Sequence, residues 1–176
     1  MRQALVIPGY LYGPHTPLLM FAAGAAEARG ASIRAHQWDP PEGLTLGDRL
    51  AFVRGEVAPL LAAALPQLVI AKSLGTYAAP LAAEHDLPAV WLTPVLDDPA
   101  LVEGLRRASA PRLLVGGTAD PMWDGPLART LSPYVCEIDG ADHGMYVPGP
   151  LIGSVEVLGR VVVAVEGFLD SLGWPG

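Results

Sequence analysis

Short apolar runs alternate with longer segments of helical periodicity along this chain, and this alternation constrains the fold more than any other feature. Runs such as QLVIA (67–71) and RLLVGGT (112–118) are almost wholly apolar or small, as strands buried on both faces are. Helical segments between such strands are typical of a parallel sheet covered on both faces. Strands are expected at 3–7, 32–38, 67–71, 88–93, 112–118 and 134–139. Helices are expected at 17–29, 46–65, from about 74, and at 99–108, 124–130 and 155–172.

The composition agrees with one globular α/β domain that spans residues 1–176. Hydrophobic residues make up 51% of the chain and charged residues only 16%, which supplies a large core and argues against disorder. A chain of this length suits a single hydrophobic core. No internal repeat or low-complexity tract interrupts the pattern, so no domain boundary is predicted.

Charge, cysteine content and the N-terminal segment exclude several classes of protein. A formal net charge of −7 argues against binding to nucleic acid or to an anionic membrane surface. The one cysteine, Cys136, allows no disulfide within the chain. The first apolar run stops at Pro8 and Gly9, which is too early for a signal peptide or a membrane span. We therefore expect a cytoplasmic protein.

Three residues with the potential for covalent catalysis each follow a predicted strand. Ser73 follows the third strand, Asp120 the fifth and His143 the sixth. Functional groups of parallel α/β sheets gather at the carboxyl ends of the strands. A serine hydroxyl becomes a nucleophile when a base takes its proton, and the base in turn needs an acid that orients it. Taken singly, these residues are a helix cap, a helix-starting Asp and a loop His; together, in this order, they favour a catalytic triad.

The order Ser–Asp–His and the turn around the serine resemble the α/β-hydrolase superfamily, whose nucleophile lies in a G-x-S-x-G turn. Here the turn is Ala71-Lys72-Ser73-Leu74-Gly75, with Ala in the first small position. The resemblance covers essentially the whole chain. It implies that Ser73 is the nucleophile, Asp120 the acid and His143 the base. It also implies two backbone oxyanion donors, the N–H of Leu74 and that of Tyr10, although Pro8-Gly9 stands where the family often has His-Gly.

The resemblance is to the small, lidless serine hydrolases, because the connection from residue 94 to residue 111 holds only one short helix. It implies a three-layer sandwich whose six parallel strands have the order 2-1-3-4-5-6, without a cap domain. The walls of the open site would then come from the loops at the strand ends. Predicted wall residues are Tyr10, Tyr12, Val95, Leu96, Met122, Trp123, Met145 and Tyr146. The alternative for any of Met122, Trp123 and Met145 is that it simply covers the end of the sheet.

Neighbouring residues leave two alternatives open. Asp97 and Asp98 follow the fourth strand, where some family members place the acid, although Asp120 is preferred. A Ser–Lys dyad of Ser73 and Lys72 is conceivable, but adjacent residues on such a turn point apart. The preferred interpretation of Lys72 is a packed stem whose ammonium finds a carboxylate.

The resulting hypothesis is a serine hydrolase that acts on a neutral, partly apolar carboxylic ester or thioester. No Arg or Lys in the strand-end loops is placed to bind an anionic substrate, and no metal-ligand or phosphate-binding pattern is present, so no cofactor is expected. The expected partner is a small acyl substrate. An amidase or acyltransferase would use the same machinery. The fold could also persist as a non-catalytic binding or regulatory module.

Overall fold

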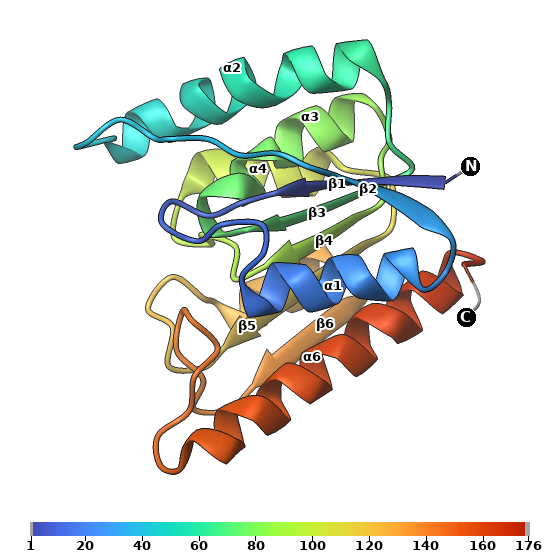
Figure 1. The fold of residues 1–176 in the computed structure, drawn as a ribbon. Coiled ribbons are helices and arrows are strands. Elements are labelled where there is room, and N and C mark those ends of the chain that lie inside the picture. Colours follow the sequence, from blue (N-terminus) through green and yellow to red (C-terminus); the bar gives the residue numbers. More distant parts are fainter. Residues whose placement is uncertain (1, 175–176) are drawn as a thin grey trace.

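The computed structural model describes residues 2–174 and contains a single six-stranded sheet (Figure 1). All neighbouring strands are parallel, in the order β2-β1-β3-β4-β5-β6, which confirms the predicted fold class and strand order. The strands are β1 (Arg2–Ile7), β2 (Ala31–Ala35), β3 (Leu68–Lys72), β4 (Ala89–Leu92), β5 (Arg112–Gly117) and β6 (Tyr134–Ile138).

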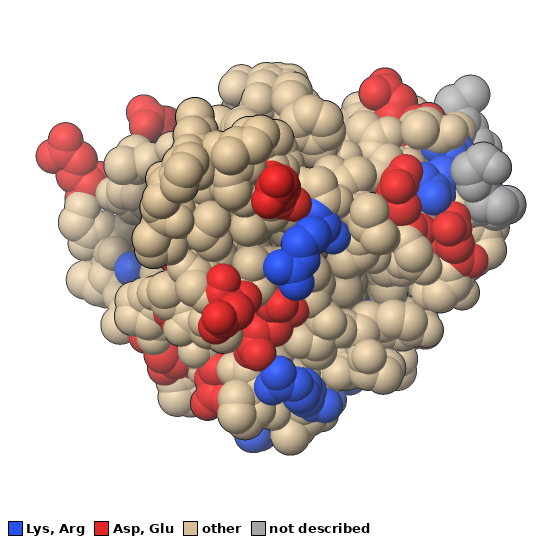
Figure 2. All heavy atoms as spheres, turned by 90° about the horizontal axis from the view of Figure 1, so that it is seen from below, with Lys and Arg blue, Asp and Glu red and all other residues tan. Residues whose placement is uncertain are grey.

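Helices cover both faces of the sheet and complete a three-layer sandwich. One face carries α1 (Pro17–Glu27) and α6 (Leu151–Ser171), which lie below the sheet in Figure 1. The other carries α2 (Leu46–Ala63), α3 (Ala79–Glu84), α4 (Pro99–Arg107) and α5 (Gly125–Leu131). The connection from β4 to β5 contains α4 and no other helix or strand. Seen from the side of α6, uncharged residues cover most of the surface (Figure 2).

The central strands read as unbroken apolar runs because each of their two faces meets a core. In β1, Ala4 and Val6 pack into the cluster beneath α1 and α6, whereas Leu5 and Ile7 pack into the cluster beneath α2, α3 and α4. All four are at most 1% exposed. Successive side chains of a strand point to opposite faces, so a strand buried on both faces forms a nearly continuous apolar run.

Two helical segments differ from the sequence prediction. A 3₁₀ segment, Ser73–Ala78, precedes α3 where an α-helix was expected from about residue 74. Pro80 explains the difference, because its ring nitrogen has no N–H to direct at the Thr76 carbonyl; the Ala79 N–H binds that carbonyl instead. The last helix begins at Leu151, four residues before the predicted start at 155.

The carboxyl ends of all six strands lie at one end of the sheet, on the left in Figure 1, and so do the loops that follow them. This is the end at which the sequence places the candidate catalytic residues. Among residues 2–174, no helix combines the length and the hydropathy that crossing a lipid bilayer would require.

Candidate active site

Ser73 lies on a sharp turn directly after β3, with a backbone φ of +49°. This left-handed conformation is costly for a residue with a Cβ, by about 1–3 kcal/mol, and it persists only where the surroundings hold it. The Thr76 hydroxyl donates to the Ser73 carbonyl at 2.6 Å and closes the turn. Gly75 lets the turn lie against β1, because a Cβ there would be 2.6 Å from the Pro8 carbonyl oxygen and 2.7 Å from that of Ile7.

The structure brings Ser73, His143 and Asp120 together in one hydrogen-bonded chain. The His143 Nε2 lies 2.8 Å from the Ser73 Oγ, and its Nδ1 lies 2.7 Å from the Asp120 Oδ2. A carboxylate can only accept a hydrogen bond, so the Nδ1 carries a proton and the Nε2 is left to accept the serine hydroxyl. This is the arrangement in which a histidine can take a proton from serine.

Asp120 is fixed more firmly than a surface carboxylate would be. Its side chain is fully buried, and its second oxygen, Oδ1, accepts the Met122 N–H at 3.0 Å. The alternative acids serve elsewhere: Asp97 is exposed, whereas Asp98 caps α4 through the Ala100 N–H and accepts the Tyr77 hydroxyl. Only Asp120 among these carboxylates contacts His143.

The loop that carries His143 is built around Asp142. The Asp142 Oδ1 accepts the N–H groups of Gly144 and Tyr146 at 2.8 and 2.9 Å, while its own N–H donates to the Tyr146 carbonyl. Met145 adopts a φ of +64° and lies buried at the base of the loop. Asp142 is therefore a turn residue that shapes the loop through its hydrogen bonds to Gly144 and Tyr146.

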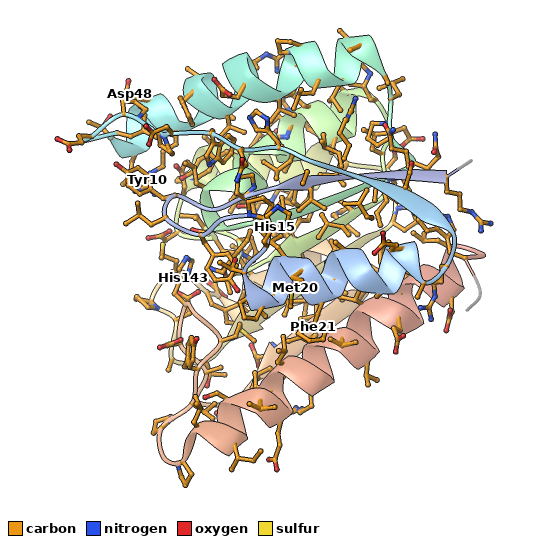
Figure 3. The ribbon with its side chains drawn as sticks, viewed as in Figure 1. Tyr10, His15, Met20, Phe21, Asp48 and His143 are labelled. Atoms are coloured by element: carbon orange, nitrogen blue, oxygen red, sulfur yellow. The ribbon has the colours of Figure 1, made fainter. Side chains whose placement is uncertain are left out.

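The two proposed oxyanion donors have their N–H groups free within residues 2–174. Neither the Tyr10 nor the Leu74 N–H donates to any acceptor there. Gly9 brings the loop after β1 close to the nucleophile, since a Cβ on Gly9 would be 3.6 Å from the Ser73 Cβ and 3.0 Å from that of Tyr12. Figure 3 places Tyr10 and His143 at the same end of the sheet.

The expectation that Lys72 finds a carboxylate is wrong. Its Nζ donates to the Thr93 Oγ1 and to the His143 carbonyl oxygen, both at 3.1 Å, and it lies 4.7 Å from the centre of the Tyr12 ring. It makes no hydrogen bond with Ser73, so the two do not form a dyad. Burial lowers the pKa of Lys72 from 10.5 to about 8, against the attraction of Asp120 and then of Asp142.

Some predicted wall residues line cavities at the loop after β1. A pocket of about 140 Å³ lies between the loop after β1, the His143 loop and the starts of α1 and α6. A wider cavity of about 600 Å³ lies between the loop after β1 and the segment after β2, and Tyr10 and Tyr12 both contribute to its lining. The smaller pocket, here the apolar pocket, is lined by Tyr12, Pro17, Leu18, Gly144, Met145, Tyr146, Leu151, Ser154, Val155 and Leu158.

Other predicted wall residues lie elsewhere. Val95 and Leu96 are 2% and 4% exposed and belong to the core beneath α2–α4, which corrects their assignment to an open wall. Trp123 packs its ring against Gly116 of β5 and donates its indole N–H to Glu137, so it covers the end of the sheet, while Met122 is half-buried beside it. Sequence reasoning missed the contributions of α1 and α6 to the apolar pocket.

Metal ligation has no support from the described residues. Within residues 2–174, His, Cys, Asp and Glu side chains form no group of three or more that could hold an ion.

Comparison with known proteins identifies the fold. The sequence matches no protein-family model and no curated protein. Solved structures match strongly, including a protein of the α/β hydrolase superfamily from Xanthomonas campestris, with a TM-score of 0.73 and 18% identity over 97% of this chain and 99% of that one. This chain has the α/β-hydrolase fold.

Two further structures have the same fold, and one of them is described as an esterase domain. Est1E from Butyrivibrio proteoclasticus, solved with ferulic acid bound, has a TM-score of 0.68 at 15% identity, over 97% of this chain and 89% of that one. The esterase domain of a Rhodothermus marinus protein has a TM-score of 0.64 at 15% identity, over 97% and 87% of the two chains. This α/β-hydrolase-fold chain therefore matches nearly the whole length of these structures.

Proposed function

We propose that this protein is a serine hydrolase that cleaves a carboxylic ester or thioester through an acyl-enzyme. The observation that carries the proposal is the hydrogen-bonded chain from the Ser73 hydroxyl through His143 to the buried Asp120. The fold, and esterases that share it, support the same reaction class. A binding module has no need of all three groups in this geometry.

Acylation begins when the Ser73 Oγ attacks the carbonyl carbon of the substrate and its proton passes to the His143 Nε2. Asp120 stabilises the imidazolium that forms, because its carboxylate accepts the Nδ1 proton throughout. The negative charge on the substrate oxygen is held by the free N–H groups of Leu74 and Tyr10. Each such donor lowers the free energy of the transition state by about 2.7–4 kcal/mol.

The tetrahedral intermediate then expels the alcohol or thiol, which leaves with the proton from the His143 Nε2. Water enters, His143 removes one of its protons, and the resulting hydroxide attacks the acyl carbon. The second intermediate collapses to the free acid, and the proton returns from His143 to the Ser73 Oγ. The imidazole and the serine end each cycle as they began, so the reaction needs no cofactor.

The apolar pocket supports an uncharged, aliphatic or aromatic substrate group. Its walls carry no charged side chain, and Leu151 and Val155 at the start of α6 are 69% and 54% exposed beside it. Tyr12 lines the pocket and lies beside Gly9, which in turn lies close to Ser73. Burial of apolar substrate surface there would contribute about 25 cal/mol per Å².

A substitution in α6 tests this substrate class. Val155→Trp should narrow the apolar pocket and lower kcat/KM for long acyl p-nitrophenyl esters about tenfold more than for the acetate, since each buried methylene is worth about 0.8 kcal/mol. Val163→Trp is the matched control, because Val163 is exposed on the same helix and does not line the pocket. Equal effects of the two variants on every chain length would exclude the pocket as the binding site.

Labelling with a fluorophosphonate probe tests the reaction class itself. The native protein should become labelled, and Ser73→Ala should not. Absence of labelling in the native protein, or equal labelling of the variant, would overturn the hydrolase and leave the binding module. Adding an amide substrate, or an alcohol as acyl acceptor, to the ester assay then separates an esterase from an amidase or an acyltransferase.

A further inference from the structure

Lys72 is the only lysine in the chain; the other basic residues among its 11 Lys and Arg are all arginines. It is also nearly inaccessible, at 3% exposure, at the end of the central strand β3. Lysine is among the residues that are least often buried, and burial of its charge is expensive unless the charge is paired. The mechanism above does not use Lys72, so its position calls for a separate explanation.

The ammonium of Lys72 joins three segments that meet at the nucleophile. It donates to the Thr93 hydroxyl at the end of β4 and to the carbonyl oxygen of His143 in the loop after β6. It also lies 4.7 Å from the centre of the Tyr12 ring in the loop after β1, within the range of a cation–π interaction. The next residue along the chain is Ser73 itself.

No carboxylate pairs with this charge at salt-bridge distance within residues 2–174, although Asp120 and Asp142 attract it from farther away. A buried ammonium held only by neutral groups is a poor source of stability, because the desolvation penalty is not offset by a partner of opposite charge. Thr93, which accepts one of its hydrogen bonds, adopts an unfavourable φ of +45° for a β-branched residue. Unfavourable conformations of this kind cluster where function requires them.

We propose that Lys72, in its protonated form, is a positioning residue that holds the His143 loop and the Tyr12 ring in place around Ser73. This inference rests on the proposed hydrolase function. The hydrogen bond to the His143 carbonyl fixes the main chain of the same residue whose imidazole must stay within hydrogen-bond reach of the serine. A displacement of about 1 Å in such a group can lower the rate about a hundredfold.

Loss of the proton of Lys72 would weaken its contact with the Tyr12 ring and its hydrogen bond to the His143 carbonyl. The neutral amine has no charge to attract the Tyr12 ring, and it donates a weaker hydrogen bond than an ammonium does. Because the pKa of Lys72 is lowered by burial to about 8, this loss falls within an accessible pH range. The titratable groups that face Lys72 are Tyr12 after β1, Asp120 after β5, and Asp142 and His143 after β6.

Two variants test the role. Lys72→Met removes the charge and the donors at similar length, and should lower kcat for a p-nitrophenyl ester between about tenfold and a hundredfold, with a smaller change in KM. Lys72→Arg keeps a charge at every pH. The wild-type kcat should decline as pH rises through about 8, and this decline should be absent in Lys72→Arg. Equal kcat and equal pH profiles in wild type and Lys72→Met would overturn the proposal.

The same experiment distinguishes failure of the proposal from failure of the hydrolase function. A wild type that no fluorophosphonate labels refutes the hydrolase function. A labelled wild type whose kcat is matched at every pH by that of Lys72→Met refutes only the role of Lys72.

Because the chain has one lysine, its side-chain NMR signal can be followed without any variant, which keeps the test valid if Lys72→Arg does not fold. The midpoint of that titration should coincide with the decline in kcat; a midpoint near 10.5 would contradict the proposal.

Discussion

The loops on the two sides of Ser73 are held in different ways. On the side of β5 and β6, Asp120 is buried and doubly hydrogen-bonded, and Asp142 closes the His143 loop with two further bonds. On the side of β1, Tyr10 and Leu11 are 36% and 91% exposed, and the Tyr10 side chain makes one hydrogen bond, to the Pro41 carbonyl.

The difference separates the groups that must keep a fixed geometry from those that meet the substrate. An acid and a base that exchange protons need positions defined to a fraction of an ångström, and burial with several hydrogen bonds supplies them. An entrance for an apolar substrate needs accessible side chains and free backbone donors. Lys72 connects the two sides, since it contacts both the His143 carbonyl after β6 and the Tyr12 ring after β1.

The largest effect is expected from a substitution of the acid, Asp120, on the side of β5 and β6. Asp120→Asn should lower kcat about 10⁴-fold, because an amide can donate to the Nδ1 and so favours the wrong tautomer of His143. Asp97→Asn is the matched control on the neighbouring strand end and should retain near-normal turnover of a p-nitrophenyl ester. The reverse result would show that the acid lies after β4.

The next largest effect is expected from loss of the backbone oxyanion donor at Tyr10, in the loop after β1. Tyr10→Pro removes the backbone N–H and should lower kcat about 10²–10³-fold, as the loss of one oxyanion donor does. Tyr10→Phe keeps the N–H and loses only the hydroxyl that binds the Pro41 carbonyl, so it should remain close to wild type. If both variants hydrolyse the ester normally, the donor is another group of this loop.

The smallest effect is a pH dependence of stability at the residue that links the two sides. Between about pH 8 and the unfolded pKa of 10.5, the unfolded chain holds a proton that folded Lys72 has released. The free energy of unfolding should therefore rise with pH across this window, by about 3 kcal/mol in total. The gain is complete above pH 10.5 and is lost as the pH falls from there through about 8.

Urea unfolding at a series of pH values measures this rise. Lys72→Met should lack it, so that the stability of wild type relative to the variant increases from neutral to alkaline pH. Arg54→Met is the control, because Arg54 is half-exposed and stays charged throughout this range. Parallel curves for wild type and Lys72→Met would mean that Lys72 titrates alike in the folded and unfolded states.

The fold could be predicted because its signals are local. The apolar runs of β1 and β3 reflect burial on both faces, and this requirement acts on consecutive residues of each strand. The site could be located because parallel strands bring their ends together, so Ser73, Asp120 and His143 meet despite their separation in the sequence. The 3₁₀ segment was missed although Pro80, which causes it, was visible.

Contacts between distant loops could not be predicted in the same way. The sequence places Leu96 and Trp123 at strand ends just as it places Tyr12 and Met145, yet Leu96 is buried in the core and Trp123 packs on Gly116. The path of each loop decides which side chain faces the cavity, and that path depends on packing across the whole end of the sheet.

The sequence by itself indicated the layered fold and the residues that gather at the carboxyl ends of its strands, because the periodicity of helices and strands follows from their backbone geometry. The order of the strands was implied by the resemblance of the sequence to the α/β-hydrolases. Only the tertiary structure decided what Lys72 does. Its partners are a hydroxyl on β4, a carbonyl after β6 and an aromatic ring after β1. A backbone carbonyl has no signature in the sequence, so a lysine that binds one reveals its role only when the folded chain sets the two together.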